Sequence, residues 1–185
     1  MNFKNLLLKY EGNFPRYTSY PTAPHFSDKV NSDVYKNWLL SLEDNQEISL
    51  YFHIPFCHQL CWYCGCFTKI TQRYKPIKDY LDSLIGEIYV ILKIIKNKNL
   101  QVYHIHFGGG SPNILSVEDF ELLTQKIKDS FVIKNDAEIA IEIDPRTNDK
   151  SKIISYVKSG INRVSIGVQD FDSDVQLAIH IYGNK

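Results

Sequence analysis

The 185-residue sequence has the length and composition of one globular domain with a hydrophobic core. Hydrophobic residues make up 44% and charged residues 23%, and 21 basic residues balance 21 acidic ones, so the net charge is zero. This balance removes the electrostatic argument for a nucleic-acid or anionic-membrane partner, and neither partner is expected. Any function must therefore come from a local site.

The first 45 residues predict an N-terminal extension, because the stretch FPRYTSYPTAPHFSD (14–28) is rich in Pro, Tyr and Ser and shows no clear period. A short amphipathic helix is expected at 32–42. Residues 1–13 are too polar for a secretory signal, and no apolar run is long enough to span a bilayer. The sequence thus predicts a cytoplasmic location, where reducing conditions argue against a disulfide framework.

From residue 48 onward, predicted strands and helices alternate. The expected strands are 48–54, 102–107, 137–143 and 161–169, and the expected helices are 75–99, 116–131, 149–160 and 172–180. Ser116 is expected to be the N-cap of the second of these helices, and Gly160 is expected to close the third. This alternation predicts an α/β fold with four βα units and a parallel sheet. The expected domains are an extension at 1–45 and a core at 46–185.

The strand at 137–143 has two different faces. Ile139, Ile141 and Ile143 share one face, while Glu138, Ala140, Glu142 and Asp144 share the other. Since a sheet covered by helices on both sides should be apolar on both faces, the polar face predicts a partial barrel that holds a ligand. The alternative is that some of these polar residues merely cap strand ends.

All four cysteines lie within ten residues, directly after the first predicted strand. They are Cys57, Cys61, Cys64 and Cys66. A structural zinc site needs a second separated Cys pair, and a dithiol redox pair at 61–64 leaves two thiols unexplained. The spacing C-x-x-x-C-x-x-C therefore favours an iron–sulfur cluster with three thiolate ligands and one iron that is open or held by Cys66. Zinc and dithiol redox chemistry remain the alternatives.

This spacing after the first strand of a partial βα barrel resembles the radical S-adenosylmethionine (SAM) superfamily. Within it, several segments resemble the oxygen-independent coproporphyrinogen III oxidase (coproporphyrinogen dehydrogenase) family in order and spacing. They are RYTSYPTAPHF (16–26), YFHIPFCHQLCWYCGC (51–66), HFGGGSP (106–112), IEIDPR (141–146) and NRVSIGVQDF (162–171).

The resemblance implies a 4Fe-4S cluster on Cys57, Cys61 and Cys64, with Cys66 matching an extra family cysteine. It also implies two SAM molecules, with contacts from Tyr51, Tyr63, Gly109, Gly110, Ser111, Glu142 and Gln169. Alternatives remain open: a tight turn at the glycines, tyrosines in the core, and an internal salt bridge of Glu142, for example with Arg163. His53, His104 and His106 are expected to be satisfied core residues without a site role.

The resemblance further implies an oxidoreductase of porphyrin and heme biosynthesis. Such an enzyme converts two propionate side chains of coproporphyrinogen III to vinyl groups without dioxygen, through SAM cleavage by the reduced cluster. The expected partners are coproporphyrinogen III and an electron donor of flavodoxin or ferredoxin type, and a monomer is expected. The alternative from the same superfamily is a heme chaperone that binds and transfers heme.

The chain departs from the family near its end. Family members are more than twice as long, and their pattern continues with an arginine where this chain has Ile181. We therefore expect a truncated core with the first four βα units, weakly active or inactive by itself unless a second polypeptide supplies the remaining strands. The fourth strand would then be an open edge of the sheet.

Overall fold

A computed structural model describes Lys9, residues 23–96 and residues 98–181. The chain divides into two compact units between Trp38 and Leu39. The described elements before this boundary are the 3-10 helix η1 (Ala23–His25) and the first part of helix α2 (Ser32–Ser41), which confirms the helix expected at 32–42. The RYTSYPT motif at 16–22 lies outside the described residues.

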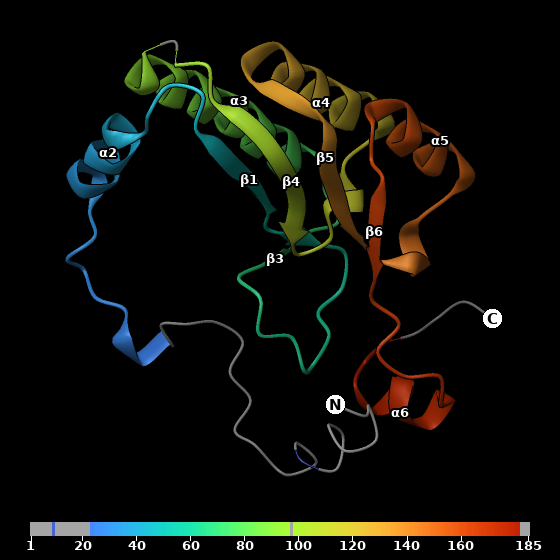
Figure 1. Cartoon of the computed structure of the whole chain (residues 1–185). Helices are drawn as coiled ribbons and strands as arrows, with labels where there is room; N and C mark the ends of the chain where they lie inside the picture. Colours follow the sequence, from blue (N-terminus) through green and yellow to red (C-terminus); the bar gives the residue numbers. More distant parts are fainter. Residues whose placement is uncertain (1–8, 10–22, 97, 182–185) are drawn as a thin grey trace. The chain divides into compact units, whose positions relative to one another are not determined.

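The second unit contains a parallel sheet in the order β1-β4-β5-β6 (Figure 1). Its strands are β1 (Glu47–Ile54), β4 (Gln101–Gly109), β5 (Val132–Ile143) and β6 (Arg163–Ile166). The helices are α3 (Lys75–Ile95), α4 (Val117–Ser130), α5 (Lys150–Ser159) and α6 (Ser173–Ala178), with 3-10 turns η2 (Pro112–Ile114) and η3 (Pro145–Thr147). Each strand of the sheet is followed by a helix, which confirms the α/β fold and the partial barrel of four βα units.

The expected caps are present at the helix ends. Ser116 Oγ accepts a hydrogen bond from the backbone N–H of Asp119 at 3.2 Å, which fixes the start of α4. Asp149 does the same for the N–H of Lys152 at 2.9 Å at the start of α5. Gly160 ends α5 with φ +92°, a left-handed conformation that glycine adopts without steric cost.

The fourth strand is shorter than the expected 161–169. Just before β6, the side chain of Asn162 replaces the backbone hydrogen bonds between the strands. It accepts from Ile139 N–H and donates to Ala137 C=O, both at 2.8 Å. After β6, Gln169 has φ +66°, which is incompatible with an extended strand. The short parallel pair β2 (Phe56–Cys57) and β3 (Lys69–Ile70) was not predicted, because two-residue strands carry no periodic signal.

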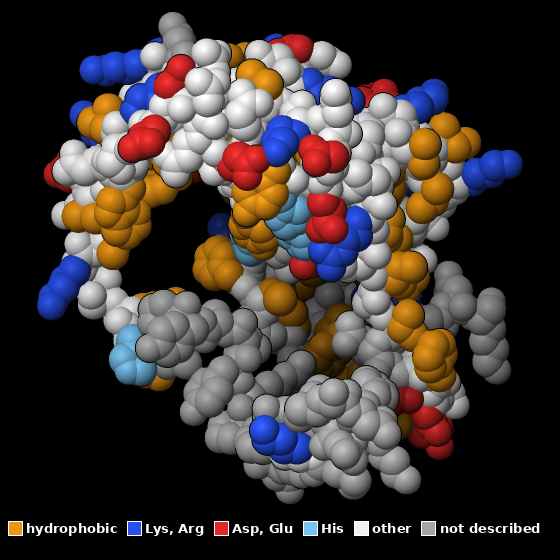
Figure 2. All heavy atoms as spheres, viewed as in Figure 1, with side chains coloured by type: hydrophobic (Ala, Val, Ile, Leu, Met, Phe, Trp, Pro, Cys, Tyr) orange, Lys and Arg blue, Asp and Glu red, His pale blue; other side chains and the backbone are white. Residues whose placement is uncertain are grey.

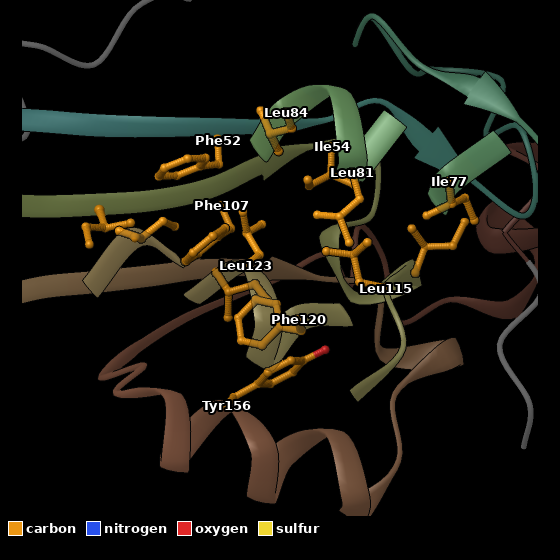
Figure 3. Close-up of a cluster of buried hydrophobic side chains, with 14 of the residues drawn as sticks. Phe52, Ile54, Ile77, Leu81, Leu84, Phe107, Leu115, Phe120, Leu123 and Tyr156 are labelled. Atoms are coloured by element: carbon orange, nitrogen blue, oxygen red, sulfur yellow. The ribbon is translucent and has the colours of Figure 1, made fainter. Parts of the chain in front are cut away.

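The hydrophobic core lies between the sheet and helices α3, α4 and α5. Phe107 on β4 is 1% exposed and packs against Phe52 and Phe120, at ring-centroid distances of 5.4 and 5.2 Å. Phe120 in turn contacts Tyr156 of α5 at 4.9 Å (Figure 3). Burial of each such side chain contributes about 1.5–3 kcal/mol, so this face carries much of the stability of the fold.

The aliphatic and polar faces of β5 are arranged as the sequence predicts. Ile141 and Ile143 are buried against the core, while Glu138 is exposed and Glu142 is half-buried.

On the molecular face drawn in Figure 2, Lys and Arg side chains lie among Asp and Glu side chains, without a large patch of one sign. Among the described helices, none combines the length and the hydropathy that a membrane span requires.

Candidate functional site

A cavity of about 320 Å³ lies at the carboxyl ends of the strands. Ile54 of β1 pairs with Gly109 of β4, and Ile143 of β5 pairs with Ile166 of β6, so four loops leave the sheet at one edge. Ligand sites of open parallel sheets lie at this edge. The lining residues are Cys57, Gln59, Cys61, Tyr63, Cys64, Cys66, Gly109, Gly110, Ser111, Glu142, Ile143, Asp144, Arg146, Ser165, Ile166, Gly167, Gln169 and Ile181.

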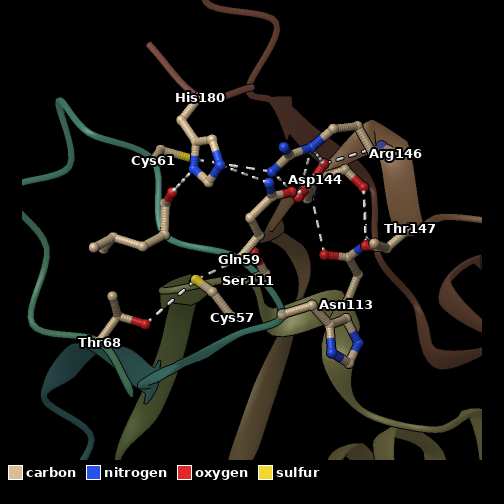
Figure 4. A network of polar contacts seen from close by, with 12 residues as sticks. Cys57, Gln59, Cys61, Thr68, Ser111, Asn113, Asp144, Arg146, Thr147 and His180 are labelled. Atoms are coloured by element: carbon tan, nitrogen blue, oxygen red, sulfur yellow. Dashed lines mark hydrogen bonds and ion pairs between the residues drawn. The ribbon is translucent and has the colours of Figure 1, made fainter. Parts of the chain in front are cut away.

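All four cysteines line this cavity, and none forms a disulfide. Cys57 ends β2, and its sulfur receives two hydroxyl donors, Thr68 Oγ1 at 3.3 Å and Ser111 Oγ at 3.6 Å (Figure 4). The two hydroxyls hold the sulfur in place at the wall of the cavity. The β2–β3 pair therefore fixes one thiol at a position where it can act as a ligand.

The loop with the other three cysteines is held by residues distant in sequence. The N–H of Trp62 donates to the carbonyl of Ile179 at 3.1 Å, and the indole ring stacks on His180 with centroids 5.2 Å apart. The Nδ1 atom of His180 also lies 3.0 Å from the carbonyl oxygen of Leu60. Within the loop, Cys64 N–H donates to Cys61 C=O at 3.0 Å and closes a turn that brings both thiols to one side.

Burial is the main influence on the ionisation of this loop. It raises the pKa of the Cys61 thiol, while the nearby Arg146 guanidinium acts in the opposite direction. Burial also raises the pKa of Tyr63 to about 12, and the thiols of Cys61 and Cys64 add to this shift. Without metal the Cys61 thiol is therefore protonated near neutral pH, so metal binding must release its proton.

Glu142 projects from the polar face of β5 into the cavity. Its Oε1 lies 3.0 Å from His106 Nε2, and its Oε2 accepts from the N–H of Gly109 at 3.3 Å. Tyr51 stacks on His106 with centroids 5.8 Å apart and an interplanar angle of 17°. Tyr51, unlike the other predicted SAM contacts, is outside the cavity lining and supports it through His106.

The glycine turn after β4 lies closely against the cysteine segment. Gly109 has φ +117°, and a Cβ built there would lie 2.7 Å from His53 Nδ1. A Cβ at Gly110 would lie 2.6 Å from both Phe56 C=O and Thr68 Oγ1. The glycines are therefore required by close backbone approach between the two loops, in addition to the turn itself.

Asp144 and Arg146 form an ion pair at the cavity wall. Arg146 Nη2 lies 2.6 Å from Asp144 Oδ2, and Nε donates to Asp144 Oδ1 at 2.8 Å. Burial alone would raise the pKa of Asp144, but hydrogen bonds from the Arg146 side chain and backbone hold it below its ordinary value. The same Nη2 lies 3.8 Å from Cys61 Sγ.

The cavity brings together four cysteine thiols and the Arg146 guanidinium, which are groups that could bind an anionic iron–sulfur cluster. In the described ranges, no three His, Cys, Asp or Glu side chains converge into a group that could hold one ion. Arg146 Nη1 is buried and has no hydrogen-bond partner among the described residues, so an anionic cluster would supply one.

Six of the seven predicted SAM contacts line the cavity: Tyr63, Gly109, Gly110, Ser111, Glu142 and Gln169. The suggested salt bridge between Glu142 and Arg163 is not formed, because Arg163 pairs with Glu138 at 2.7 Å. The sequence interpretation missed Arg146 and the contact of His106 with Glu142. The IEIDPR motif contained the first signal, and the shared strand face of His106 contained the second.

The Radical SAM superfamily model matches residues 51–185. This range contains the second half of β1, the cysteine loop and strands β4, β5 and β6. The chain therefore belongs to the radical SAM superfamily.

Among its relatives, the chain is 46% identical over 170 residues to the oxygen-independent coproporphyrinogen III oxidase of Bradyrhizobium diazoefficiens, covering 92% of this chain and 38% of the relative. It is 37% identical over 175 residues to the enzyme of that name from Escherichia coli, covering 95% of this chain and 38% of that protein. A solved structure of coproporphyrinogen III oxidase from Escherichia coli, described as a radical SAM enzyme, matches with a TM-score of 0.82 and 34% identity, covering 97% of this chain and 39% of that one. The chain thus spans about two fifths of the length of these proteins.

Proposed function

We propose that this chain carries the cluster-binding and SAM-binding part of an oxygen-independent coproporphyrinogen III oxidase. The observation that carries the proposal is the convergence of the cysteines, the glycine turn and Glu142 on one cavity at the carboxyl ends of the strands. The relatives are oxygen-independent coproporphyrinogen III oxidases, which supports this choice over a heme chaperone. The substrate would be coproporphyrinogen III, and an electron donor of flavodoxin or ferredoxin type would serve the cluster.

In this proposal, Cys57, Cys61 and Cys64 hold a 4Fe-4S cluster, with Cys66 as a candidate for the remaining iron. When bound, the cluster supplies the single electron that cleaves SAM and starts oxidative decarboxylation of the propionate side chains. The residues of the chain would bind the cofactor and orient it. The Gly109–Gly110 turn lets backbone groups approach the cofactor, and Ser111 supplies a hydroxyl beside Cys57.

Glu142 would accept hydrogen bonds from SAM, since a carboxylate in a cavity needs donors to offset its desolvation. His106 and the Gly109 N–H already fix its two oxygens, so the carboxylate is oriented before the ligand arrives. Tyr63 and Gln169 line the same cavity and would contact SAM, whereas Tyr51 would act indirectly by packing on His106.

The test is anaerobic reconstitution of the chain with iron and sulfide. We expect about four iron atoms per chain and an iron–sulfur spectrum that changes when SAM is added. Glu142→Gln should keep the iron and weaken the SAM response. Glu138→Gln is the matched control, because Glu138 lies on the same face of the same strand but pairs with Arg163 outside the cavity.

Zinc uptake in place of iron, or a reconstituted cluster whose spectrum is unaffected by SAM, would contradict the proposal. Formation of vinyl products from coproporphyrinogen III with dithionite as electron donor would extend it from cofactor binding to the complete reaction. Heme binding without either response would favour the chaperone alternative.

A further inference from the structure

The Arg146 guanidinium lies between a carboxylate and a cysteine sulfur. Nη2 is 2.6 Å from Asp144 Oδ2 and 3.8 Å from Cys61 Sγ, and a second hydrogen bond joins Nε to Asp144 Oδ1 at 2.8 Å. The paired donors of arginine hold the plane of the group fixed, which the single ammonium of lysine cannot do. A permanent positive charge is therefore directed at one of the thiols.

The position of this charge is determined by a rigid support. The backbone of Asp144 is held by the fully buried Asn113, whose Oδ1 accepts from Asp144 N–H at 3.1 Å and whose Nδ2 donates to Asp144 C=O at 3.0 Å. The backbone N–H of Arg146 also donates to Asp144 Oδ1, at 3.0 Å, within the short turn η3. The guanidinium cannot swing away from Cys61 without breaking this network.

The arrangement leaves a donor unused. Arg146 Nη1 is buried, and no described residue accepts its hydrogen bonds. A buried guanidinium nitrogen is normally hydrogen-bonded, so Nη1 can still donate to a bound acceptor. A structural role as partner of Asp144 is already filled by Nε and Nη2, and it does not account for either Nη1 or the contact with sulfur.

We propose that Arg146 is a positioning residue that makes the cluster bound through Cys61 easier to reduce. This inference rests on the proposed 4Fe-4S cluster. Reduction adds one electron from an external donor such as dithionite, and no bond is made or broken. The reduced cluster carries one more negative charge than the oxidised cluster, so a fixed cation at a ligand sulfur stabilises it more.

The test is a potentiometric titration of the reconstituted full chain, followed by electron paramagnetic resonance. For Arg146→Met, we expect the ratio of reduced to oxidised cluster at a given potential to fall about tenfold, which for one electron corresponds to about 59 mV. Arg146→Lys should keep most of the wild-type potential because it keeps the charge. Arg163→Met, which removes another carboxylate-paired arginine from outside the cavity, should change nothing.

Two further measurements separate charge from structure. The double variant Arg146→Met with Asp144→Asn removes the carboxylate left unpaired by the single change, and a shift of the same sign should remain. In protein labelled with nitrogen-15 arginine, the reduced cluster should show a nitrogen-15 coupling that is absent from Arg146→Lys. If Arg146→Met fails to hold a cluster, the absence of this coupling in the wild-type protein would still overturn the inference.

The inference is overturned if Arg146→Met has the wild-type potential, if Arg146→Lys shifts as much as Arg146→Met, or if labelled wild-type protein shows no nitrogen-15 coupling. Failure of the wild-type chain to take up iron would instead refute the proposed cluster itself. The two failures are therefore distinguishable.

Discussion

The helix-covered face of the sheet and the cavity at the carboxyl ends of its strands differ in what they require from their residues. On the helix-covered side, Phe107 and Ile141 are almost completely buried, and shape and apolar area determine the packing. At the cavity, the loop after β2 is exposed or half-buried and is positioned by single hydrogen bonds such as that from Trp62 to Ile179. The core therefore stabilises the fold, and the loop presents the chemistry.

The difference implies that folding and cofactor binding can be altered separately. A change in the core should cost stability throughout the unit. A change at a cavity thiol should leave the fold of the metal-free chain intact and remove only the capacity to bind iron. The glycine turn joins the two regions and should show both effects.

The largest effect is expected for Phe107→Ala. Removal of this ring leaves a cavity between Phe52 and Phe120, and such changes cost about 3–5 kcal/mol in the free energy of unfolding. Urea denaturation of the metal-free chain measures this loss. Tyr103→Ala is the control on the same strand, because Tyr103 is 47% exposed and should lose less than about 0.5 kcal/mol. Similar losses for both variants would contradict the assignment of the core.

An intermediate effect is expected for Gly109→Ala. The new Cβ would lie 2.7 Å from His53 Nδ1, in a backbone conformation with φ +117°, and such strain costs about 1–3 kcal/mol. His53 must also move from its 2.9 Å contact with Phe67 C=O, which displaces the end of the cysteine loop. Urea denaturation and iron uptake should both be impaired. Gly65→Ala, where no heavy atom lies within 4 Å, should affect neither.

The smallest effect on stability is expected for Cys61→Ser. The side chain is only partly buried, so the free energy of unfolding of the metal-free chain should change by less than about 0.5 kcal/mol. Iron retained after anaerobic reconstitution should nevertheless fall to background. Cys66→Ser provides the comparison with an exposed thiol. A large loss of stability in Cys61→Ser would show that the loop and the core are not independent.

Much of the fold could be predicted because its signals are local. Alternation along 137–143 assigns Ile141 to the core and Glu142 to the cavity, and Ser116 and Gly160 fix helix ends through their own side chain or backbone. The cysteine spacing likewise locates the candidate cluster loop without knowledge of tertiary structure. These features depend on neighbours within a few residues.

The remaining features depend on contacts between distant segments. The pairing of β2 with β3 joins residues that are 13 positions apart, and the contact between Arg146 and Cys61 joins residues 85 positions apart. The sequence predicts His106 as a core residue. Its strand face is a local signal, but its contact with Glu142 depends on the register between β4 and β5. The N-terminal motif at 16–22 and the domain boundary at 45 and 46 stay predictions.

The contact between Trp62 and Ile179 has a consequence for the order of events during biosynthesis. These residues are separated by more than 100 positions, so the cysteine loop cannot take its final position until the segment around Ile179 has left the ribosome. Cysteine thiols in the nascent chain would meanwhile be accessible to oxidants. The proposed cluster would therefore be assembled only after the segment around Ile179 has been synthesised.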